Sequence, residues 1–145
     1  RVNPSGRLAE TIPLKLPDHP SYLDFPGENG HVRHGEGLHV GYRGFDAREQ
    51  PVSYPFGFGL SYTTFSYGEA GATVTADSVE VTVPVTNSGA RDGREVVQVY
   101  VSKPGSRVRR VPRELKGFAT VPIAAGATET VTVRISPQIT GASTA

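Results

Sequence analysis

The second half of the chain alternates hydrophobic and polar residues with a period of two. Between residues 79 and 86, a valine at every odd position alternates with glutamate, threonine or proline. Alternation of this kind is typical of a β-strand that buries one face and exposes the other. Similar runs recur, separated by turn-forming glycine, asparagine and serine. The predicted strands are residues 64–67, 72–76, 79–86, 95–102, 115–123 and 128–135.

Short strands without an intervening helix predict a mainly β fold, an antiparallel sandwich of the immunoglobulin-like type. In the strand at 95–102, Val97, Val99 and Val101 share one face. Such a sandwich usually has seven strands, one more than the pattern predicts here. The alternation stops before residues 136–145, which are small and polar. We therefore expect the sandwich to be incomplete at its C-terminus, with its last hairpin missing.

The first part of the chain, up to about residue 67, has a different character. Prolines and glycines recur so often that no helix of ten residues fits between them. One segment, residues 37–42, alternates in the manner of a short strand, with Leu38, Val40 and Tyr42 on one face. A stretch so poor in regular structure rarely folds alone. We expect it to be the trailing end of a domain whose body lies upstream.

Composition excludes several kinds of site. The 145 residues contain no cysteine, which rules out disulfides, thiolate metal sites and cysteine nucleophiles. Lysine and arginine number 15 against 14 aspartates and glutamates, and the net charge of +1 indicates no polyanionic partner. No apolar stretch approaches the ~20 residues of a membrane span, and no signal peptide is apparent at the start. The compartment stays open between the cytoplasm and export.

Carboxylates and histidines in the coil-rich part are the first candidates for chemistry. Acidic residues in coil usually form turns or carry solvated charge, and no pair among these stands out as catalytic. The histidines lack the convergent arrangement and supporting shell of a metal site. We expect no catalytic residue, no metal site and no cofactor. The residues concerned are Asp18, Asp24, Glu28, Glu36, Asp46, His19, His31, His34 and His39.

Four arginines, Arg107, Arg109, Arg110 and Arg113, form a basic cluster between two predicted strands. Such a cluster can contact an anion or a polysaccharide. The favoured interpretation is a solvated loop whose arginines pair with nearby carboxylates. No aromatic residues interleave with the arginines as a nucleic-acid site would need.

Several strings of the sequence, in order, resemble glycoside hydrolase family 3, which includes many bacterial β-glucosidases. Together they span residues 1 to about 135. His34 and Phe58 depart from the aromatic residue and the histidine that are frequent at those places, and the family's closing Gly-x-Tyr strand has no counterpart. The matching strings are VNPSGRL (2–8), ETIP (10–13), YLDFPG (22–27), GEGLHVGYR (35–43), PFGFGLSYTTF (55–65), VTNSG (85–89), GREVVQVYV (93–101) and RELKGF (113–118).

This resemblance implies an architecture. Family 3 enzymes have a barrel domain, an α/β sandwich domain and, often, a fibronectin type III-like domain. By similarity, residues 1–49 are the end of the α/β sandwich, residues 50–66 a linker and residues 67–145 the fibronectin type III-like domain, its last hairpin missing. The family's catalytic aspartate and glutamate both precede the asparagine–proline stretch near the start of this chain. The segment is therefore expected to be inactive by itself.

The resemblance also implies partners. The upstream barrel and α/β sandwich domains would contact this segment, and the whole enzyme would hydrolyse terminal β-glucosides with retention. Aromatic and arginine anchors are favoured in interfaces. Glu36 is interpreted as structural, bonding to the backbone near the domain junction. The candidate interdomain contacts are Glu36, Tyr42, Arg43, Phe56 and Tyr62.

Two other hypotheses stay open on the sequence alone. In one, the chain is a free-standing, non-catalytic β-sandwich that binds carbohydrate or a polyanion through the loop from Arg107 to Arg113, called the arginine loop below. Its sandwich half has only Tyr67, Tyr100 and Phe118 as aromatics, which is few for a sugar platform. In the other, the chain is a truncated gene product without a function of its own.

Overall fold

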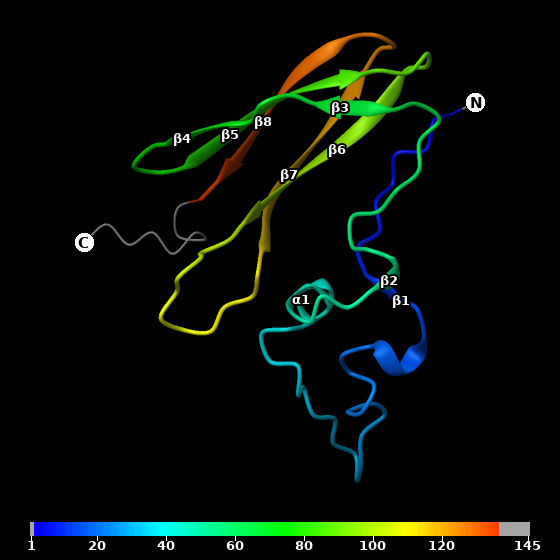
Figure 1. The fold of residues 1–145 in the computed structure, drawn as a ribbon, viewed down its shortest axis with the longest axis vertical. Helices are drawn as coiled ribbons and strands as arrows, with labels where there is room; N and C mark the ends of the chain where they lie inside the picture. Colours follow the sequence, from blue (N-terminus) through cyan, green and yellow to red (C-terminus); the bar gives the residue numbers. More distant parts are fainter. Residues whose placement is uncertain (1, 137–145) are drawn as a thin grey trace. The chain divides into compact units, whose positions relative to one another are not determined.

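The computed structural model describes residues 2–136, and most of its regular structure is β (Figure 1). The first half holds only short elements, and the longer strands follow one another in the second half. The elements of the first half are β1 (Ile12–Pro13), a 3₁₀ turn (Leu16–Asp18), α1 (Tyr42–Ala47) and β2 (Val52–Tyr54). The later strands are β3 (Phe65–Tyr67), β4 (Gly71–Val74), β5 (Val79–Asn87), β6 (Gly93–Val101), β7 (Glu114–Ile123) and β8 (Thr128–Ile135).

Strand β5 organises the larger of the two sandwich sheets. It pairs antiparallel with β3, β4 and β8, and the β5–β8 ladder runs from Val79 opposite Ile135 to Thr86 opposite Thr128. Strands β6 and β7 form a separate hydrogen-bonded pair. The predicted antiparallel sandwich is thereby confirmed, with all six expected strands within a few residues of their predicted limits.

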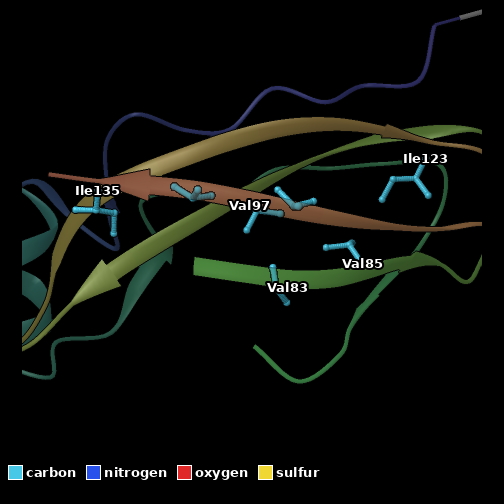
Figure 2. Packing of buried hydrophobic residues seen from close by; sticks show 7 residues of the cluster. Val83, Val85, Val97, Ile123 and Ile135 are labelled. Carbon is cyan, nitrogen blue, oxygen red and sulfur yellow. The ribbon is translucent and has the colours of Figure 1, made fainter. Parts of the chain in front are cut away.

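The core lies between these two sheets. Valines of β5 and three residues of β8 face Val97 of β6 and Ile123 of β7, and Figure 2 shows several of these side chains converging. Val99 and Val101 pack against the same cluster, as the predicted shared face requires. A period-two pattern therefore places every second residue of each long strand in one apolar layer. The buried cluster comprises Val83, Val85, Val97, Ile123, Val131, Val133 and Ile135.

A fully buried asparagine closes one end of the core. The amide of Asn87 donates to the carbonyls of Arg91 (2.7 Å) and Ile123 (3.0 Å). Its Oδ1 accepts from the hydroxyl of Thr63 (2.6 Å) and the N–H of Gly89 (3.1 Å). All four hydrogen-bonding positions of the side chain are thus used, which offsets the cost of burying an amide. Asn87 thereby connects the turn expected after β5 to the end of β7.

The prediction of a strand at residues 37–42 is wrong. The chain turns there, with the N–H of His39 donating to the carbonyl of Glu36 (2.9 Å), and Tyr42 begins the helix α1. Gly37 and Gly41 have φ values of 55° and 58°, a left-handed conformation that an extended strand cannot contain. Two glycines therefore override the alternation of the residues between them.

The chain forms two compact units. Among the described residues, the sandwich unit contains residues 2–7, 59–101 and 115–136, and the coil-rich unit contains residues 8–58 and 102–114. The domain limits expected at residues 49/50 and 66/67 stay a prediction. The sequence predicted that residues 136–145 lack the last hairpin of the sandwich. Residues 137–145 lie outside the described residues, so this stays a prediction.

No helix among residues 2–136 is long and apolar enough to cross a membrane.

Replacement of Val85 by alanine should destabilise the sandwich by about 2 kcal/mol, because Val85 is fully buried and its two methyl groups would leave a cavity. Val74→Ala is a matched control, since the same change on β4 affects a side chain that is 74% exposed. Urea unfolding followed by circular dichroism measures both. Equal losses for the two variants would contradict the described core.

Candidate interaction sites

A carboxylate is buried in the apolar layer at the start of β6. The period of the strand puts Glu95 on the same face as Val97, Val99 and Val101. The residue is only 6% exposed. Burying an ionised carboxylate is costly unless a charge partner and hydrogen bonds accompany it.

Glu95 has both. A terminal nitrogen of the Arg7 guanidinium lies 2.6 Å from each carboxylate oxygen, and the Tyr67 hydroxyl donates to Oε1 at 3.0 Å. The three side chains come from the N-terminal segment, from β3 and from β6. Charge-assisted hydrogen bonds of this kind are roughly twice as strong as neutral ones. The network therefore joins the N-terminal segment to two strands of the sandwich.

The pKa of Tyr67 is raised to about 12 from its ordinary value of 10.0. Partial burial of the phenol is the largest cause, followed by the negative charge of Glu95 and the hydrogen bond to it, while Arg7 acts in the opposite direction. Each of the raising effects penalises the phenolate. Tyr67 thus stays a hydrogen-bond donor at neutral pH.

A second polar contact holds the same N-terminal segment. The Oδ1 atom of Asn3 accepts from the N–H of Tyr62 (2.9 Å) and the hydroxyl of Ser61 (3.1 Å), and its amide donates to the carbonyl of Asp92 (3.0 Å). Val2 is almost fully exposed and adds no packing. Asn3 and Arg7 therefore fasten residues 2–7 to the sandwich unit through polar contacts.

Sequence reasoning missed this network. In the sequence, Asn3 and Arg7 were noted only as part of a segment that resembles family 3, and Glu95 was noted only as part of a predicted strand. One signal was present: Glu95 stands two positions before Val97 on a row that is otherwise apolar. A charge on an inward row needs a partner, although the pattern does not say which residue supplies it.

Three of the five candidate interdomain residues lie together in the coil-rich unit. The rings of Tyr42 and Phe56 are 4.7 Å apart between centroids, and the guanidinium carbon of Arg43 lies 5.9 Å from the centre of the Tyr42 ring. Such separations are favourable for ring–ring and cation–π contacts. The helix start at Tyr42 and the turn after β2 supply these side chains.

The other two candidates have different surroundings. Glu36 belongs to the coil-rich unit, and its Oε2 atom is buried without a hydrogen-bond partner among the described residues. Tyr62 belongs to the sandwich unit, where its side chain is exposed while its N–H is held by Asn3. The backbone contact expected for Glu36 is thus not made by this oxygen. The role of all five residues as interdomain contacts stays a prediction.

The arginine loop is part of the coil-rich unit, where Val111 is its buried residue. Arg113 forms a forked ion pair with Asp46 of α1, through Nε to Oδ2 (2.7 Å) and a terminal nitrogen to Oδ1 (3.2 Å). This pairing is the kind that the favoured interpretation expects. The other three arginines, Arg107, Arg109 and Arg110, are exposed. Their role as an anion contact stays a prediction.

The described residues contain no group of three or more histidine, aspartate or glutamate side chains arranged to hold a metal ion.

The chain is similar to known proteins along most of its length. A family model for the fibronectin type III-like domain matches residues 95–141. A β-glucosidase of Rhizobium radiobacter is 46% identical over 144 residues, which cover 94% of this chain and 18% of that protein. An exo-α-(1→6)-L-arabinopyranosidase of Bifidobacterium longum is 48% identical over 134 residues, again 18% of its length. The crystal structure of a family 3 β-glucosidase from Bifidobacterium adolescentis superposes with a TM-score of 0.88 at 45% identity, covering 94% of this chain and 20% of that one.

The chain is a C-terminal part of a glycoside hydrolase family 3 protein. This confirms the resemblance, and with it the fibronectin type III-like domain. The segment spans about a fifth of the length of the relatives it matches, which is the expectation for part of a larger multidomain chain. A free-standing binding module is not favoured by these similarities.

Removal of one partner from the buried pair of this family 3 segment should be costly. Arg7→Ala is expected to lower the free energy of unfolding by about 3 kcal/mol, because it leaves the Glu95 carboxylate buried and unpaired. Arg7→Met combined with Glu95→Leu should lose less than Arg7→Ala alone, since no buried charge remains. Urea unfolding measures all of these variants.

The exposed pair of Arg134 and Glu80 provides the control. Its Nε–Oε1 distance is 2.7 Å, but the arginine side chain is 75% exposed. Arg134→Ala should therefore cost less than about 1 kcal/mol. A loss for Arg7→Ala no larger than that for Arg134→Ala would show that burial of the Glu95 pair does not matter.

Ionisation of Tyr67 should weaken the fold at alkaline pH. Its folded pKa is about 12 against 10.0 when unperturbed, so folding favours the neutral phenol. The resulting stabilisation is complete below pH 10 and is lost as the pH rises from about 10 to about 12. Tyr67→Phe should remove this part of the alkaline loss. Urea unfolding at about pH 9 and about pH 11 tests it, and an identical loss in both proteins would contradict the assignment.

Proposed function

We propose that the complete protein is a retaining glycoside hydrolase of the β-glucosidase type, and that this segment is an accessory part of it without catalytic residues. The observation that carries the proposal is the 46% identity to a β-glucosidase over 94% of the chain. Retention and the upstream position of the catalytic carboxylates are implied by the family resemblance. A terminal β-D-glucoside is the first substrate to test.

The relatives point to a second substrate. A protein named as an exo-α-(1→6)-L-arabinopyranosidase matches this segment as well as the β-glucosidases do. Similarity within the segment therefore does not determine which sugar is the substrate, which agrees with a catalytic pocket that lies elsewhere in the complete protein. An α-L-arabinopyranoside is the second substrate to test.

The proposed partners are the upstream barrel and α/β sandwich domains of the same polypeptide. The surface of the coil-rich unit supports this, because many of its large apolar side chains are exposed while Phe45 and Val111 are its buried hydrophobic residues. Apolar exposure on this scale marks a surface that another part of a protein covers. The exposed side chains include Leu14, Leu16, Leu23, Phe25, Leu38 and Val40.

Within this surface, Tyr42, Arg43 and Phe56 are the proposed anchors toward the upstream domains. Their rings and guanidinium are already stacked in the coil-rich unit, so little side-chain freedom would be lost on contact. Aromatic and arginine residues are enriched at such contacts.

The complete protein should hydrolyse 4-nitrophenyl β-D-glucoside, whereas the 145-residue chain alone should not. In the complete protein, Phe56→Ala should lower Tm by several degrees, because it removes a stacked ring from the proposed contact. The ratio of kcat/KM for the glucoside to that for the α-L-arabinopyranoside should stay unchanged. Calorimetry and steady-state kinetics measure these quantities.

Phe118→Ala, which removes an exposed ring from β7, is the matched control and should shift Tm less. An unchanged Tm for Phe56→Ala would remove that residue from the contact. Failure of the complete protein to cleave either glycoside would contradict the proposed function.

A further inference from the structure

The coil-rich unit contains a cavity of about 380 Å³ beside α1. Its polar lining consists of Asp24, Glu36, His39, Arg48 and Arg109, contributed by the turns before α1, by α1 and its end, and by the arginine loop. No aromatic ring other than the imidazole lines it, so the cavity offers little surface for stacking. Asp24 and Glu36 contribute carboxylates and Arg48 and Arg109 contribute guanidinium groups, so the charges of the lining balance.

Glu36 is the unusual member of this lining. Its Oε2 atom is buried and accepts no hydrogen bond from the described residues. Neither arginine of the lining hydrogen-bonds to this oxygen. Nε of Arg48 donates instead to the carbonyl of Gly44 (3.1 Å), and its guanidinium carbon lies 5.8 Å from the centre of the Phe45 ring. A buried carboxylate oxygen without a donor is strongly unfavourable, so a donor is needed.

A second side chain in the same unit shows the same deficit. Thr11 is only 8% exposed, and its hydroxyl has no partner within the described chain. In the sandwich unit, by contrast, the buried side chains of Asn87, Glu95 and Thr63 are all hydrogen-bonded. Native proteins satisfy nearly all buried polar groups. Among the described residues, the unmet hydrogen bonds therefore concentrate in the coil-rich unit, whose apolar surface is also exposed.

We propose that the cavity at Glu36 binds a cationic side chain, a guanidinium or an ammonium group, from the part of the complete protein that precedes this segment. The inference rests on the proposed function in so far as an upstream part is needed. A cation fits better than a neutral donor, because charge-assisted hydrogen bonds are the stronger ones and neither arginine of the lining donates to this oxygen. Glu36 is then a docking residue for the upstream domains.

The test compares Glu36→Gln in the 145-residue chain and in the complete protein. In the chain, the substitution removes the charge of a carboxylate that has one buried oxygen without a donor, so Tm should stay the same or rise by a few degrees. In the complete protein, it removes one half of an ion pair, so Tm should fall by several degrees. The expected signature is this difference between the two lengths of protein.

Two further variants sharpen the comparison. Glu10→Gln makes the same change at an exposed position of the coil-rich unit and should leave both Tm values nearly unchanged. Glu36→Asp keeps the charge and should lose less than Glu36→Gln in the complete protein. It also provides a folded variant if Glu36→Gln does not fold there.

Two results would overturn the proposal. A lower Tm for Glu36→Gln in the 145-residue chain would mean that a residue of the chain itself, such as Arg109, already satisfies the carboxylate. A complete protein whose Tm does not fall for either substitution at Glu36 would mean that no cation reaches the cavity. Hydrolysis of the two glycosides by the unsubstituted protein is a separate readout, so failure of the docking site and failure of the proposed function are distinguishable.

Discussion

Burial of the valine row of β5 is the constraint on which the sandwich depends. Val83 and Val85 can leave water only if a second sheet covers them, and β6 and β7 supply that cover through Val97 and Ile123. The same strand pairs with three neighbours, so its position also sets theirs. Hydrophobic burial thus selects the two-layer arrangement, and hydrogen-bonded ladders set its register.

Polar groups inside this apolar layer give it specific connections. Asn87 ties the end of β5 to β7, and Glu95 ties β6 to Arg7 and Tyr67. Hydrophobic packing tolerates small shifts, whereas a buried amide or carboxylate accepts only an arrangement that meets its hydrogen bonds. Among the described residues of the sandwich unit, the buried polar side chains have their hydrogen-bond partners. In the coil-rich unit, by contrast, Glu36 and Thr11 have buried polar atoms without donors or acceptors.

This contrast links the structure to the family assignment. A segment that matches about a fifth of its relatives' length contains one unit with a closed polar network and one with an open surface. The core and the closed polar network of the sandwich unit agree with the fibronectin type III-like domain that the family model matches.

The sequence by itself determined the six sandwich strands and their inward rows, because period two is a local property of extended backbone that each strand shows independently. Tertiary structure decided the rest. The partner of Glu95 lies 88 positions away, and no local pattern connects two such residues. The stacking of Tyr42 on Phe56 likewise needs the path of the chain between them. The prediction of a strand at 37–42 failed because two glycines there have positive φ values. Glycine can adopt either sign of φ, so the sequence alone does not show which one occurs.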